Sequence, residues 1–141
     1  MSDVRNPAEE LADRYVAVWN EPDPDVRRKA VEGLWSEDGV HLLEPPEEMV
    51  TRAAEIGVVA ALEARGHDAL SRRVTRAYDE FVAPGEFVFR RRGEAAALSD
   101  MVKLRWEMVP ASGGEVLAVG IDLLVLGADG RIKKDYQFIE G

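Results

Sequence analysis

Apolar residues recur at two different spacings along this chain, and the change of spacing divides it into a helical first half and a β-rich second half. Up to residue 82 they return every three to four positions, which is the period of an amphipathic helix. From residue 86 onward many alternate with polar residues, which is typical of strands with one wet face. Helices followed by an antiparallel meander predict a single α+β domain over residues 1–141.

Four helices are predicted in the first half. A proline opens each of the first three, where its missing N–H costs nothing, and Asn6 caps the first. The segment Asn20–Pro24 ends the first helix, the third covers Pro46–Glu55, and the fourth follows Gly66. The residues expected to face inward from the first two helices are Leu11, Tyr15, Val18, Trp19, Val26, Ala30, Leu34 and Trp35.

Strands are predicted where β-branched and apolar residues lie between turn signals. Two short ones, Val40–Leu43 and Val58–Leu62, interrupt the helices, and the second can equally be a helix extension. The other predicted strands are Glu86–Arg91, Met101–Val109, Glu115–Leu126 and Arg131–Ile139. In the strand that begins at Met101, the side with Lys103, Arg105 and Glu107 is expected to face water.

The last two predicted strands form the most informative segment of the chain. They flank Ala128-Asp129-Gly130, a tight-turn signal, and so predict a β-hairpin. Asp122 lies in the first of them, between Ile121 and Leu123. A carboxylate in an apolar strand is costly unless it is partnered, protonated or facing a pocket. Asp122 is therefore the first candidate site residue.

The composition limits the classes of function. The 141 residues are 46% hydrophobic, which is enough for a sizeable core, and the net charge of −9 argues against nucleic acid and anionic membranes as partners. Without cysteine there are no disulfides, thiolate metal sites or cysteine nucleophiles, and two histidines give little basis for a zinc site. No apolar run is long enough to span a bilayer and the first residues lack a signal-peptide core, so a cytoplasmic location is expected.

Three segments carry a family resemblance: Arg14-Tyr15-Val16-Ala17, Trp35-Ser36-Glu37-Asp38, and a hairpin pattern with Gly120, Asp122 and Asp129-Gly130-Arg131-Ile132. With them the chain resembles the nuclear transport factor two-like superfamily, which includes ketosteroid isomerase and the SnoaL-like polyketide cyclases. The resemblance implies a cone-shaped barrel, in which a strongly curved, mostly antiparallel sheet wraps around N-terminal helices. It also implies a pocket inside the cone and a homodimer formed through the sheet. So widely reused a fold does not fix a reaction.

The resemblance implies roles for single residues as well. Tyr15 matches a tyrosine that donates to the substrate oxygen in ketosteroid isomerases, and Asp122 matches their second donor, on a late strand. The base of those isomerases is an aspartate before proline. Glu44, which precedes Pro45, is the nearest counterpart, with one inserted residue and a longer side chain. His41 lies on the same predicted strand and is the other candidate base, because an imidazole titrates near neutral pH.

Each candidate also has a purely structural interpretation. Asp122 can be an acid bonded to a tyrosine of the first helix or to an indole N–H, and Tyr15 can be a core residue. Glu44 can belong to a solvated acidic loop, and His41 can be a structural histidine. The residues expected to line the pocket are His41, Trp106, Asp100 and Trp19. The two tryptophans also fit a packed core, and the aspartate also fits a turn.

Two functional hypotheses follow. In the first, a homodimer holds a small hydrophobic molecule, a carbonyl compound, in an apolar pocket and isomerises or cyclises it by proton transfer, without a cofactor or metal. Asp122 and Tyr15 would stabilise the oxyanion, while Glu44 or His41 would move the proton. In the second, the same fold is a non-catalytic small-molecule-binding or dimerisation module. Convergent polar groups at the base of the pocket favour the enzyme, and a closed, packed cone favours the module.

Overall fold

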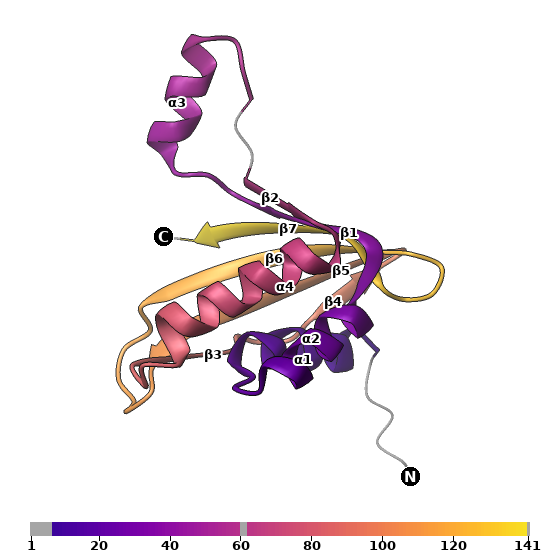
Figure 1. Cartoon of the computed structure of the whole chain (residues 1–141), viewed down its shortest axis with the longest axis vertical. Helices are drawn as coiled ribbons and strands as arrows, with labels where there is room; N and C mark the ends of the chain where they lie inside the picture. Colours follow the sequence, from indigo (N-terminus) through magenta and orange to yellow (C-terminus); the bar gives the residue numbers. More distant parts are fainter. Residues whose placement is uncertain (1–6, 60–61, 141) are drawn as a thin grey trace.

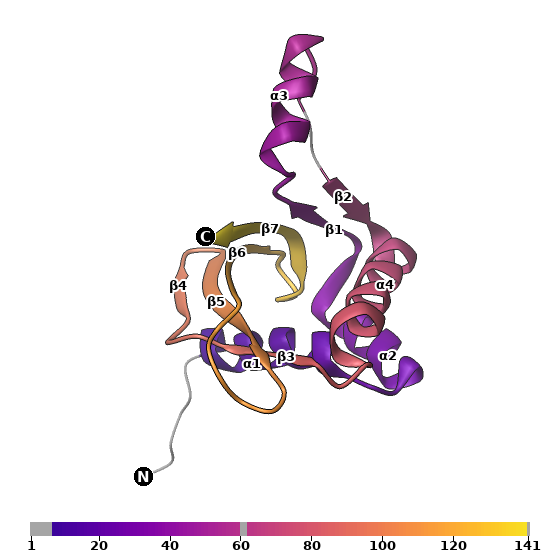
Figure 2. The ribbon, with the colours of Figure 1, turned by 90° about the vertical axis from the view of Figure 1, so that its left-hand side faces the viewer.

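A curved sheet holds three of the four helices against its inner side (Figures 1 and 2). The computed structural model describes residues 7–59 and 62–140. The helices are α1 (Pro7–Asn20), α2 (Pro24–Leu34), α3 (Glu47–Glu55) and α4 (Gly66–Ala77), and α4 continues into a π-helical turn, η1 (Tyr78–Val82). The strands are β1 (Trp35–Leu43), β2 (Leu62–Arg65), β3 (Phe87–Arg91), β4 (Ala96–Leu98), β5 (Met101–Pro110), β6 (Ala118–Leu126) and β7 (Ile132–Glu140).

The sheet has the order β2-β1-β7-β6-β5-β3, with β4 paired to β5. Strands β1 and β7 are parallel, and the other described pairs are antiparallel. The sheet curves strongly but does not close, because β2 and β3 remain at its two edges (Figure 2). The predicted fold class, an α+β fold with a strongly curved and mostly antiparallel sheet, is confirmed.

The core fills the space between the helices and the inner face of the sheet. Its largest fully buried apolar side chains are Trp35, Tyr15, Leu34, Leu70, Leu104, Leu124 and Ile132. Helix α3 is different, because it has no buried residue and stands on an arm away from this core (Figure 1). Among the described residues, no helix combines the length and the apolar character needed to cross a bilayer.

The second helix begins as predicted and turns Ala30 and Leu34 inward as expected, but its buried face is shifted by one residue near the start. Asp23 caps it by accepting from the N–H groups of Asp25 and Val26, and Pro24 occupies the first turn. Val26, predicted to be buried, is 47% exposed, whereas Arg27 is buried. Periodicity could not predict this, because Arg27 is held by polar contacts: its guanidinium donates to the Glu21 carbonyl. The predicted cap of the first helix, Asn6, lies outside the described residues.

The first strand is longer than predicted. It begins at Trp35, which was expected to end the preceding helix, and its register with β7 shifts between Trp35 and Val40. Gly39 lies in this irregular stretch, where an added Cβ would come within 2.8 Å of the Ile132 carbonyl oxygen. The glycine therefore permits a close backbone approach inside a bulged strand.

The predicted strand Val58–Leu62 is wrong at its first two residues and right at its last. Val58 and Val59 are exposed and belong to no strand, and residues 60–61 lie outside the described ones. The strand β2 starts at Leu62, which pairs with Leu43, the last residue of β1. The valines have strand propensity, but no strand of the described residues pairs with them, and pairing rather than propensity decides.

Strand β5 departs from simple alternation in its second half, where Glu107 and Val109 are buried on the face expected to be wet. Lys103 and Arg105 face water as predicted, but Glu107 is buried. Its carboxylate accepts from the guanidinium groups of Arg90 and Arg92, so its burial is compensated by two charged hydrogen bonds. The three-residue strand β4 was not predicted, because it is too short to show an alternation.

Candidate functional site

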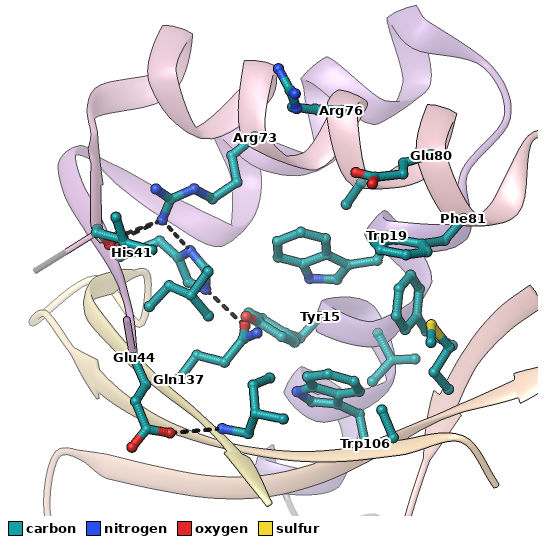
Figure 3. A pocket seen from close by; sticks show the side chains of 18 of the residues that line it. Tyr15, Trp19, His41, Glu44, Arg73, Arg76, Glu80, Phe81, Trp106 and Gln137 are labelled. Carbon is teal, nitrogen blue, oxygen red and sulfur yellow. Dashed lines mark hydrogen bonds between the residues drawn. The ribbon is translucent and has the colours of Figure 1, made fainter. Parts of the chain in front are cut away.

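A cavity of about 520 Å³ opens between α1, α4 and the inner face of the sheet (Figure 3). Its volume lies in the range of pockets that hold small molecules. The walls are mainly apolar and include Trp19, Phe81, Phe89, Trp106, Met108 and Ile139. Polar side chains also reach it: Tyr15, His41, Glu44, Arg73, Arg76, Glu80 and Gln137. This arrangement suits a ligand with a hydrophobic body and a polar group.

A buried cluster of one hydroxyl and two carboxyl groups begins at Tyr15 in the cavity wall and extends behind it. The Tyr15 hydroxyl oxygen lies 2.8 Å from Asp122 Oδ2 and 2.6 Å from Asp135 Oδ2. Trp106 donates from Nε1 to Asp122 Oδ1 at 2.7 Å. Tyr15 is 1% exposed, and both carboxylates are fully buried. The predicted hydrogen bonding of Asp122 to a tyrosine of the first helix or to an indole N–H is confirmed, because it has both partners.

The number of hydrogens limits this chain to two directions. The phenol of Tyr15 has one hydrogen, so it can donate to only one of the two carboxyl groups. Its second short contact needs a hydrogen from the other carboxyl group. Trp106 donates to Asp122 Oδ1, whereas Asp135 Oδ1 has no donor among the described residues. We therefore infer that Asp135 donates to Tyr15 and Tyr15 donates to Asp122, which places the negative charge on the carboxyl group with more donors.

The surroundings of Asp135 agree with a protonated carboxyl. Burial raises the pKa of Asp135 well above its usual value, and the neighbouring Asp122 carboxylate raises it further. Its Oδ1 is buried and has no hydrogen-bond partner among the described residues, which an ionised carboxylate would tolerate poorly. Burial likewise raises the pKa of Tyr15 well above 10.0, so the phenol keeps its proton.

A second polar chain runs along the cavity itself, from α4 to β7 (Figure 3). Arg73 Nη1 lies 2.9 Å from His41 Nδ1, and His41 Nε2 lies 2.8 Å from Gln137 Oε1. A guanidinium can only donate, so His41 Nδ1 accepts and its Nε2–H donates to Gln137. Burial lowers the pKa of His41, which keeps this imidazole neutral. Both ring nitrogens are therefore already used.

Asp122 lies one layer behind the cavity. It is not among the lining residues, because Tyr15 and Trp106 stand in front of it. Three of the four predicted pocket residues, His41, Trp19 and Trp106, line the cavity, as do Tyr15 and Glu44.

Asp100 does not line the cavity, and its prediction as a pocket residue is wrong. It was placed by its strand parity with Trp106, but β5 begins only at Met101. Asp100 lies in the turn before that strand, next to Ser99 with its positive φ of 56°, and is exposed. Its backbone carbonyl accepts the Leu126 N–H, so its role is in the turn.

Three residues of the site escaped the sequence analysis. Asp135 follows Lys133 and Lys134, so its surroundings suggest a solvated segment. Arg73 lies in a basic stretch of α4, which also suggests a wet face. Gln137 is a neutral polar residue near the end of β7. Only the hairpin register, which pairs Asp122 with Gln137 and Leu124 with Asp135, could have pointed to β7 as part of the site.

His41, Asp122 and Asp135 also lie close enough to hold a metal ion, with candidate ligand atoms all within 4.8 Å of one another. Their hydrogen bonds fit such an ion poorly. Tyr15 and Trp106 occupy three of the four carboxylate oxygens, and Arg73 uses the Nδ1 lone pair of His41. The three residues thus complete hydrogen-bonded networks rather than offering free ligands.

Gly120 explains the spacing of the hairpin motif. A Cβ at this position would lie 2.1 Å from Cζ2 of Trp106, on the neighbouring strand β5. The glycine thus lets the indole lie against the β6 backbone, from where Nε1 reaches Asp122. The two residues of the Gly-x-Asp pattern act together to place one tryptophan in the cavity wall.

Comparison of the whole structure with solved structures gives close likenesses. A proposed isomerase of the SnoaL-like family from Agrobacterium tumefaciens superposes with a TM-score of 0.76 at 23% identity, covering 96% of this chain and 100% of that one. A SnoaL-like protein of unknown function from Burkholderia thailandensis has a TM-score of 0.66 at 15% identity, over 98% and 99% of the two chains. The chain has the NTF2-like fold. No protein-family model matches the sequence, and no curated protein matches it significantly.

A third similar structure is that of a proposed polyketide cyclase from Sinorhizobium meliloti. Its TM-score is 0.59 at 15% identity, with 92% of this chain and 94% of that chain covered. At these identities the likeness concerns the fold, so the chemistry of this NTF2-like domain has to be argued from its own cavity.

Proposed function

We propose that the protein binds a small hydrophobic carbonyl compound in the cavity and moves a proton on it without a cofactor, as an isomerase or cyclase does. The observation that carries this proposal is the composition of the cavity wall, in which aromatic side chains surround polar groups on the neighbouring strands β1 and β7. The isomerase and cyclase proposed for two structural neighbours support the same class of reaction.

Glu44 is the candidate base in this proposal. It is exposed at the rim of the cavity, beside β7, where its backbone N–H donates to the Gln137 carbonyl at 3.0 Å. Its carboxylate holds only one hydrogen bond that the structure describes, a long one of 3.3 Å from the Ile139 N–H. His41 fits this role less well because its basic nitrogen already accepts from Arg73.

Asp122 and Tyr15 are positioning residues in this proposal, in place of the direct donors expected from the sequence. Their polar atoms bond to each other and to Trp106, so their role is to hold the cavity wall. The amide of Gln137 is the candidate donor to the substrate oxygen, since its Oε1 is turned toward His41.

The same observation favours a second candidate function, a non-catalytic binding module. In that case the buried cluster of Tyr15 and the two aspartates would be architecture, and Glu44 would be a rim acid without a chemical role. Proton transfer on a bound ketone separates the two functions.

The experiment follows exchange of the α-hydrogens of bicyclic and phenyl ketones in D₂O by NMR. Wild-type protein should accelerate exchange, and Glu44→Gln should lower the rate by about 10²-fold or more, the usual contribution of a general base. Glu48→Gln is the matched control, since Glu48 is exposed on α3 and does not line the cavity. Ketone binding without accelerated exchange would reject the enzyme and favour the module.

A further inference from the structure

Arg73 carries a charge into the cavity that the described part of the chain does not neutralise. Its Nη1 makes all three of its described hydrogen bonds, to His41 Nδ1, the His41 carbonyl and the Leu62 carbonyl. None of the ion pairs within residues 7–59 and 62–140 includes it. The N–H groups on Nε and Nη2 have no partner among those residues. The guanidinium is thus anchored at one nitrogen, with donors to spare.

The other end of the hydrogen-bonded chain Arg73–His41–Gln137 also offers donors. Because Arg73 can only donate, it fixes the His41 tautomer, and His41 in turn holds the Gln137 oxygen. The Gln137 amide NH₂ is left without a described partner. Arg73 and Gln137 both line the cavity, so this hydrogen-bonded chain has N–H groups without a described partner at both ends. Its acceptors, His41 Nδ1 and Gln137 Oε1, are already bonded within the chain.

A site that offers only donors, one of them cationic, selects an anionic oxygen. Guanidinium groups bind carboxylates through parallel N–H bonds, and such bonds strengthen in a wall of low dielectric. Burial lowers the pKa of Arg73, as expected for a cation that is partly desolvated. Arg76, Glu44 and Glu80 also line the cavity, but all three are exposed, so the partly buried Arg73 is the charged group held closest to the apolar wall.

We propose that the ligand of this cavity is a hydrophobic carboxylate, whose anionic head is bound by Arg73 and one N–H of the Gln137 amide while its apolar body lies against the aromatic walls; the second amide N–H is left for the reacting carbonyl oxygen. This inference rests on the proposed function and names the class of its substrate: a carbonyl compound that carries an acid group. It assigns Arg73 as the residue that sets specificity.

The test compares two probes of the same shape, 2-naphthoate and neutral 2-naphthamide, by isothermal titration calorimetry. Wild-type protein should bind the naphthoate at least ten-fold more tightly than the amide. Arg73→Met should remove this preference and leave amide binding within two-fold of wild type. Arg72→Met is the matched control, because Arg72 is exposed on the same helix and does not line the cavity. It should keep the preference, which excludes a general effect of net charge.

A second variant keeps the test decisive if Arg73→Met fails to fold. Gln137→Glu still accepts from His41 but places a negative charge where the carboxylate would bind, so it should weaken naphthoate at least ten-fold and affect the amide far less. Equal wild-type affinities for the two probes would overturn the carboxylate inference and leave the proposed function standing. No binding of either probe would contradict both.

Discussion

The two buried aspartates should respond differently to the same substitution. Asp122 accepts from Trp106 and Tyr15, whereas Asp135 donates to Tyr15. Asparagine has one acceptor oxygen and one donor nitrogen. Asp135→Asn can replace the donating hydroxyl with an N–H, but Asp122→Asn must turn a donor toward another donor. The first change should be tolerated and the second should be costly.

The magnitude follows from the bonds that each variant loses. Asp122→Asn removes one hydrogen bond to a charged group and leaves either the Trp106 N–H or the Tyr15 hydroxyl unpaired in a buried site. Together these should lower the free energy of unfolding by about 2–4 kcal/mol near neutral pH. Asp135→Asn keeps the contact with Tyr15 and should lie within about 1 kcal/mol of wild type at pH 5.

The stability of wild type and of Asp135→Asn should also depend differently on pH. The pKa of Asp135 is raised in the folded protein, so between about pH 4 and that raised value the native state holds a proton that the unfolded state has lost. Wild-type stability from this group is present below the unfolded pKa and falls by about 1.4 kcal/mol per pH unit as the pH rises toward the folded pKa. Asp135→Asn lacks this loss, so its free energy of unfolding relative to that of wild type should rise between pH 5 and pH 7.

Urea denaturation followed by circular dichroism at pH 5 and pH 7 measures both effects. Circular dichroism is preferred to tryptophan fluorescence because Trp106 touches the mutated cluster. Asp100→Asn serves as the control, since Asp100 is exposed in a turn. A tolerated Asp122→Asn together with a costly Asp135→Asn would show that the hydrogen-bonded chain runs in the opposite direction, with the proton on Asp122.

Three further outcomes are expected. Gly120→Ala should displace the Trp106 indole and lower the free energy of unfolding by about 2–4 kcal/mol in urea titration. Unchanged stability would mean that the position of the indole does not depend on a glycine at residue 120. We expect a homodimer through the outer sheet face, where Phe138, 42% exposed, pairs with Ile121 across β6 and β7. Light scattering at micromolar concentration should show a dimer that Phe138→Lys dissociates, and a monomeric wild-type protein would contradict this expectation. Arg27→Met should lower the free energy of unfolding by about 2–4 kcal/mol in thermal and urea unfolding, because it leaves the Glu21 carbonyl without the guanidinium donor. Lys29→Met, at an exposed position of the same helix, should leave the stability nearly unchanged.

Local signals predicted much of the fold, because helix starts, helix faces and tight turns are decided by neighbouring residues. Pro24 after the Asp23 cap, and the turn Asp129-Gly130 between the last strands, are examples. Features that depend on a distant partner were missed. The bulge at Gly39 exists because β7 packs beside β1, and Val58 lies outside the sheet because no strand is there to pair with it.

The candidate site was predictable to the same extent. Asp122 stood out because an acid in an apolar strand needs a partner, and Tyr15 and Trp106 are indeed its partners. Asp135 did not stand out, because two exposed lysines separate it from Ile132, the preceding buried residue of β7. The register of β6 and β7 shifts between Val125 and Leu126, and that irregularity breaks the two-residue parity on which a sequence argument depends.

The proposed function requires that the cavity receives a hydrophobic small molecule. A titration of 2-naphthamide against wild type and a cavity-filling variant measures this binding. Ala77 lines the cavity from the end of α4, and Ala97 is exposed on β4 away from it. Ala77→Trp should weaken binding at least ten-fold, and Ala97→Trp should bind like wild type. Equal affinity in wild type and Ala77→Trp, or no wild-type binding, would contradict the account.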